Sequence, residues 1–138
     1  MNLSAIGLMQ AVLVIPLLAA AGVALTGMRP NLREGVSLVA GALLFAAVWL
    51  LYPAVIAGDR VGWTLRELLP GLTISFRLEP LGMLFCLIAS FLWMVTVLYS
   101  IGYMRAHGEA HQTRFYALFA IAIASVGGIA LADNLLTL

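Results

Sequence analysis

The residues whose types and spacing could do chemistry are few, and the first candidates are His107 and His111, four residues apart. On one continuous helix, imidazoles at this spacing share a face and can bind a metal ion. Gly108 interrupts such a helix, however, and no further ligand accompanies the pair. We therefore interpret both histidines as solvated loop residues and predict no metal site.

The sequence also gives little support for nucleophilic catalysis or for cofactor binding. The single cysteine, Cys86, lies in an apolar run and has no second cysteine to pair with, so we interpret it as a small buried hydrophobe. The sequence contains no nucleophile–base pair, phosphate-binding loop or metal cluster. No catalytic residue, cofactor or metal is predicted for this chain.

The composition places these residues in a membrane protein. Of the 138 residues, 64% are hydrophobic and 9% are charged, and the mean hydropathy is +1.10, which excludes an ordinary soluble domain. The net charge of +1 and the absence of a basic patch with interleaved aromatic residues exclude nucleic-acid binding. We expect an all-α integral membrane protein.

Long apolar runs predict four transmembrane helices in one membrane region, residues 1–138. The expected spans are about 3–27, 35–57, 80–104 and 115–132, with Pro30 and Gly35 acting as breakers before the second. After the polar corner Asp133-Asn134, an apolar restart at 135–138 predicts the start of a fifth helix. We interpret the chain as an incomplete part of a larger bundle, either a fragment or the product of a split gene.

The connection from Gly58 to Glu79 differs from the other loops because it is long and charge-balanced. Ile74, Phe76 and Leu78 alternate with polar residues, and Pro70-Gly71 offers a turn, so a short extracytoplasmic hairpin is expected. The first and third loops carry more arginines than acids, and the positive-inside rule then places the N-terminus outside the cytoplasm.

Small and aromatic residues predict how the spans pack and where they meet the bilayer surface. Small residues allow close helix contacts, and amphipathic rings favour the headgroup level. We expect the faces with the small residues to be buried against helices from other chains or from a continuation of this one. The predicted helix-packing residues are Ser37, Gly41, Ser125 and Gly128. The predicted interface anchors are Trp49, Tyr52, Trp63, Tyr99 and Tyr103.

The second half of the sequence resembles a known family. The segments FRLEPLGMLF, LYSIGYMR, TRFYALF and ADNLLTL are similar to the N-terminal part of the antiporter-like, proton-conducting membrane subunits. These include the large L, M and N chains of NADH-quinone oxidoreductase (complex I), the D-type component of Mrp Na⁺/H⁺ antiporters and subunits of membrane-bound hydrogenases. The D-type component of the Mrp antiporters looks most similar, while the first two spans match only in length and hydropathy.

The resemblance implies ion translocation in a multisubunit complex of a bacterial-type inner (plasma) membrane. Its implied partners are other membrane subunits, the lipid bilayer, protons and, in the antiporters, Na⁺. In the family, the glutamate and lysine of the ion path lie beyond the equivalent of Leu138, so the ion-path residues of this chain are unknown and expected downstream. The predicted span interiors hold no Lys, Arg, Asp or Glu, and Glu79 stands where the family usually has aspartate.

Two hypotheses of different class follow. In the first, the chain is the N-terminal portion of a proton-translocating or cation/proton antiporter subunit, at most a translocating part of an NADH-quinone oxidoreductase-like enzyme. In the second, it is a small structural accessory subunit without an ion path of its own. The sequence does not choose the ion or the complex.

Overall fold

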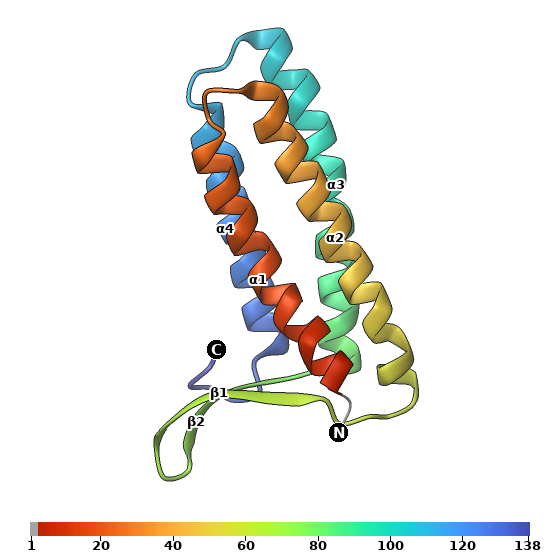
Figure 1. Ribbon diagram of the computed structural model, residues 1–138. Helices are drawn as coiled ribbons and strands as arrows, with labels where there is room; N and C mark the ends of the chain where they lie inside the picture. Colours follow the sequence, from red (N-terminus) through yellow and green to blue (C-terminus); the bar gives the residue numbers. More distant parts are fainter. Residues whose placement is uncertain (1–2) are drawn as a thin grey trace.

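Four long helices make up most of the computed structural model, which describes residues 3–138. They are α1 (Leu3–Leu25), α2 (Pro30–Ile56), α3 (Pro80–His107) and α4 (Gln112–Leu131), and they run alternately up and down (Figure 1). All four are long and apolar enough to cross a membrane. The prediction of an all-α membrane protein with four spanning helices is confirmed.

The helices form a closed arrangement in which α1 and α3 each contact both α2 and α4. We call the end with the short α1–α2 and α3–α4 connections the turn end (Figure 1). The opposite end, where α2 is joined to α3 through two strands, is the hairpin end. The residues of one connection therefore lie beside those of another at each end of the bundle.

The helix boundaries differ from the predicted spans mainly at the turn end. The predicted second span begins at residue 35, but α2 begins at Pro30. Proline suits the first turn of a helix because it has no backbone N–H that would need a hydrogen-bond partner there. The Arg33 amide already bonds to the Arg29 carbonyl at 3.0 Å. At the other connection, α3 continues to His107 and ends where Gly108 adopts a left-handed conformation. Helical backbone therefore includes residues that the sequence places in loops.

The predicted hairpin is present as β1 (Gly62–Leu69) and β2 (Leu72–Arg77), an antiparallel pair. Pro70-Gly71 forms the turn, and Gly71 has a φ of 84°, which an L side chain rarely adopts. Trp63 pairs with Phe76, and their rings stack with centroids 5.8 Å apart. Two register shifts along β1 bend the ribbon.

The segment after α4 attaches the hairpin to the bundle. The Asp133 amide donates to the Ser75 carbonyl at 3.1 Å, and the Asp133 carboxylate forms an ion pair with Arg77 at 3.0 Å. Asn134 donates to the Thr73 carbonyl at 2.8 Å and accepts from the Thr137 amide at 2.9 Å. Where a fifth helix is expected to start, residues 135–137 form a turn that Asn134 caps.

Small residues set the closest helix contacts. A Cβ added at Gly82 would lie 2.2 Å from the Ala130 carbonyl oxygen, so the backbones of α3 and α4 meet there. A Cβ at Gly41 would lie 2.9 Å from the Met94 side chain of α3. Trp93 and Cys86 of α3 are both buried in the core of the bundle.

Candidate functional site

Charged side chains gather inside the turn end of the bundle. We call Arg33 and Glu34 of α2 with Arg105 of α3 the arginine–glutamate cluster. Arg33 and Glu34 are only 5% and 4% exposed, although both lie close to the start of α2. Buried charges of this kind require partners, because moving an ion out of water costs several kcal/mol.

Arg33 reaches from α2 across to α4. Its Nη1 donates to the Thr113 hydroxyl at 3.1 Å, and its Nη2 donates to the Gln112 side-chain carbonyl at 2.8 Å. The guanidinium carbon lies 5.4 Å from the centre of the Tyr116 ring. Within the described chain, Nε of Arg33 and the Tyr116 hydroxyl are buried without a hydrogen-bond partner. The α1–α2 turn is thereby bound to the start of α4.

Glu34 faces two guanidinium groups. Arg105 donates to both of its carboxylate oxygens, with Nε to Oε1 at 3.1 Å and Nη2 to Oε2. Nη2 of Arg33 lies 3.8 Å from Oε1. Arg105 also donates to the Asn31 side chain at 2.6 Å, while its own side chain is 49% exposed. Glu34 thus joins α2 to α3 through a two-point contact.

The contacts of Glu34 make the arginine–glutamate cluster a network of paired charges. The cluster carries two positive charges and one negative charge, and its positive excess lies at the turn end. The cluster therefore has a structural and electrostatic role, binding α2 to α3 and α4.

The two histidines do not share a site. His107 is the last residue of α3, where its Nδ1 lies 2.8 Å from the Tyr103 carbonyl and its ring stacks on Tyr103. His111 has a φ of 60° and precedes α4. No group of three or more possible metal ligands occurs within residues 3–138.

The expected packing residues fall into two pairs. Ser37 and Gly41 are buried within this chain, and Gly41 faces α3, so that face does not need a helix from outside. On α4, Ser125 is exposed and bonds to the Ile121 carbonyl at 3.0 Å. Gly128 is half-buried, and an added Cβ there would meet nothing within 4 Å. Only the α4 pair leaves room for a partner helix.

The expected interface anchors lie at opposite ends of the bundle. Trp49 and Tyr52 stack on each other at 6.0 Å in the second half of α2, towards the hairpin end. Tyr99 and Tyr103 stack at 5.9 Å near the turn end of α3, and Trp63 lies on the hairpin itself. Their assignment to the two membrane surfaces remains a prediction.

Part of the chain resembles a known protein family. The family model described as NADH-Ubiquinone oxidoreductase (complex I), chain 5 N-terminus, matches residues 70–116, which include the hairpin turn, β2, α3 and the start of α4. The resemblance to the antiporter-like subunits is confirmed. The match begins at Pro70, before the first of the similar segments, and stops within α4.

A solved structure extends the likeness to the fold of nearly the whole chain. A chain of the membrane-bound sulfane sulfur reductase (MBS), an archaeal respiratory membrane complex, superposes with a TM-score of 0.74 at 21% identity. The superposition covers 91% of this chain and 19% of that chain. The fold described above therefore corresponds to about a fifth of a longer chain of that complex. Sequence comparison with curated proteins gives no match.

The sequence reasoning missed the arginine–glutamate cluster, which the resemblance to antiporter-like subunits does not predict. From the sequence, Arg33 and Glu34 are expected in a loop, and the span interiors are expected to hold no Lys, Arg, Asp or Glu. The available signal was Pro30, which is favourable at the first position of a helix and places Arg33 in the first turn of α2. The docking of Asp133 and Asn134 onto the hairpin was also missed.

Proposed function

We propose that this chain is the N-terminal portion of a proton-translocating or cation/proton antiporter subunit in a multisubunit membrane complex. The observation that carries the proposal is the family match at residues 70–116, which falls within a fold shared with part of a much longer respiratory subunit. The chain itself contributes four helices, which side-chain contacts hold together at both ends of the bundle. The ion-path residues come from outside residues 3–138.

The test separates a portion of a transporter from an accessory subunit. The protein would be tagged in its native membrane, isolated, and measured by intact mass, and the coding DNA beyond Leu138 would be translated. A polypeptide that continues into further helices with a membrane glutamate and lysine supports the proposal. A mature protein that ends at Leu138, with no completing reading frame, contradicts it.

A transport assay then tests the activity itself. Inverted membrane vesicles from cells with and without the gene would be energised, and acidification or cation-driven proton exchange would be followed with a pH-sensitive dye. The proposal predicts that deletion abolishes the pH change and that the wild-type gene restores it. Unchanged proton and cation fluxes in the deletion strain would refute it.

One observation favours the structural accessory role as the second candidate. Both charged residues buried in the described bundle, Arg33 and Glu34, take part in fixed pairs. In that case the pH change would be lost from the deletion strain because the remaining subunits no longer assemble, whereas loss of the pH change from a complex that still assembles would indicate the transport role. Native gel analysis of the deletion strain, read beside the vesicle assay, distinguishes the two roles.

Contacts with other subunits are part of the proposal. The hairpin projects from the bundle (Figure 1) and exposes four leucines around its turn. Exposed apolar groups of this kind at a membrane surface favour a protein neighbour. The residues are Leu65, Leu68, Leu69 and Leu72.

We infer further that the hairpin end faces the outside of a plasma membrane. The turn end carries four arginines and two acids, whereas the three arginines of the hairpin end are matched by acids. A membrane-impermeant maleimide should label Glu67→Cys in the hairpin of intact cells and leave Glu109→Cys in the α3–α4 turn unlabelled. The reverse pattern would overturn this orientation.

A further inference from the structure

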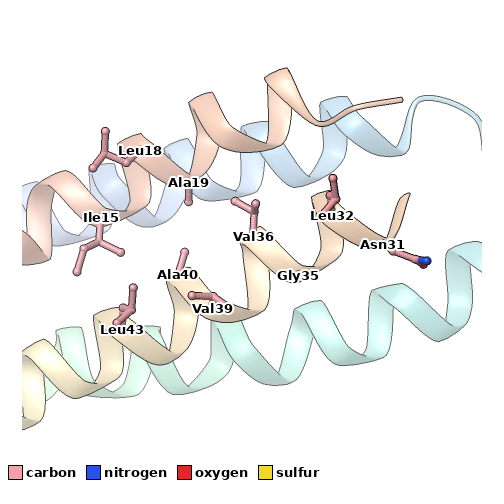
Figure 2. A pocket seen from close by; sticks show the side chains of 10 residues that line it. All are labelled: Ile15, Leu18, Ala19, Asn31, Leu32, Gly35, Val36, Val39, Ala40 and Leu43. Atoms are coloured by element: carbon pink, nitrogen blue, oxygen red, sulfur yellow. The ribbon is translucent and has the colours of Figure 1, made fainter. Parts of the chain in front are cut away.

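An open apolar groove runs between α1 and α2 from the turn end towards the middle of the bundle. Its volume is about 480 Å³. Figure 2 shows Ile15 and Ala19 of α1 pointing across it towards α2, with Asn31 at one end of the row. Gly35 lines the groove without a side chain, and an added Cβ there would meet nothing within 4 Å. The groove is thus a preformed notch on the outer surface of the bundle.

The length of the groove matches one leaflet of a bilayer. On α2 its lining runs from Asn31 to Leu43, which at ~1.5 Å per residue corresponds to about 18 Å. The hydrocarbon core is ~30 Å thick, so a leaflet contributes about 15 Å. A transmembrane helix from another subunit would extend well beyond the groove, whereas an acyl chain of one leaflet matches its length.

The charges at the mouth of the groove complement an anionic headgroup. Arg29 precedes the groove residue Asn31 by two positions, so their Cα atoms are at most about 7.6 Å apart. Arg29 is exposed, and its guanidinium has no hydrogen-bond or ionic partner within residues 3–138. The other arginines of this connection and of α3, Arg33 and Arg105, are already bound to Glu34 and its neighbours.

We propose that the α1–α2 groove binds an anionic phospholipid of the turn-end leaflet, with an acyl chain along Gly35 and the phosphate at Arg29. The apolar walls accept the chain, and the notch at Gly35 lets it lie close to the α2 backbone. Basic groups between transmembrane helices on the cytoplasmic side are typical sites for anionic headgroups. The site is independent of any ion path.

The test uses the protein purified with its partner subunits in a mild detergent. Native mass spectrometry would measure retention of phosphatidylglycerol and of phosphatidylcholine with identical acyl chains. Arg29→Gln should weaken phosphatidylglycerol binding about fivefold, the loss expected for one basic side chain at an anionic surface. Gly35→Leu should reduce binding of both lipids by filling the notch. Wild-type retention in both variants would overturn the proposal.

Matched controls keep the result specific. Arg114→Gln removes another exposed turn-end arginine, and Gly102→Leu places the same side chain on an exposed helix surface where nothing lies within 4 Å. Both should bind lipid as the wild type does. A photoreactive group attached at Val39→Cys, which lines the groove, should give a lipid adduct in the assembled complex. An adduct with another protein subunit would show that a helix covers the groove and would overturn the assignment.

Discussion

Removing the charge of Glu34 should destabilise the bundle more than removing that of its partner Arg105. In Glu34→Gln, the side chain keeps its shape and can still accept one hydrogen bond from Arg105. Arg33, however, loses its only nearby anion within the described chain, while its side chain is 6% exposed. Arg105 can turn to solvent because its side chain is 49% exposed.

The two environments set the expected magnitudes. Leaving a buried charge without a counter-ion costs about 3–5 kcal/mol, so Glu34→Gln should lower the free energy of unfolding by about 3 kcal/mol. Arg105→Gln removes two charge-assisted hydrogen bonds from Glu34, but Glu34 keeps Arg33 at 3.8 Å as a counter-ion, so we expect a smaller loss than for Glu34→Gln. The double variant should be less destabilised than the sum of the single variants by about 1 kcal/mol.

The assay is denaturant unfolding of the purified protein in detergent micelles, followed by circular dichroism for the wild type and the three variants. Glu109→Gln is the matched control, since it removes an exposed carboxylate at the same end and should change the unfolding free energy by less than about 0.5 kcal/mol. If Glu34→Gln is as stable as this control, or if the two single losses simply add, the cluster does not hold α2 against α3.

Two further tests, with three substitutions, concern the hairpin end. Gly82→Ala should cost about 1–3 kcal/mol, because the new Cβ would lie 2.2 Å from the Ala130 carbonyl oxygen, whereas Gly128→Ala, with nothing within 4 Å, should be neutral or slightly stabilising in the same unfolding assay. Equal stability of the two variants would contradict the close α3–α4 contact. Asp133→Asn should leave the melting temperature nearly unchanged, since Arg77 is 53% exposed and such pairs are worth at most about 1 kcal/mol, but it should speed proteolysis at the hairpin turn. Unchanged cleavage rates would mean that the ion pair does not hold the hairpin.

The sequence was sufficient for the elements whose causes are local. Apolar length alone predicts four spanning helices, because a helix satisfies its own backbone in hydrocarbon. The alternation around Ile74 and Phe76, with Pro70-Gly71 between the strands, likewise predicts the hairpin, since both strand periodicity and turn conformation depend on neighbouring residues.

The candidate site could not be derived in the same way, because its partners are distant in sequence. The side chains that bind Arg33 lie 79 and 80 residues later, at Gln112 and Thr113. Seen locally, an arginine next to a glutamate and three residues after a proline resembles any solvated turn. The hairpin contacts of Asp133 are equally remote, at separations of 56 and 58 residues.

These separations also define an order of biogenesis. A ribosome releases α1, α2 and the hairpin well before α4, so Arg33 is synthesised before its partners Gln112 and Thr113, and Arg77 is synthesised before Asp133. Both ends of the bundle are closed by α4 and the segment that follows it. The early helices must therefore remain open to water, to the insertion machinery or to a chaperone until α4 arrives, and a ribosome stalled before Gln112 would leave a protease-sensitive intermediate.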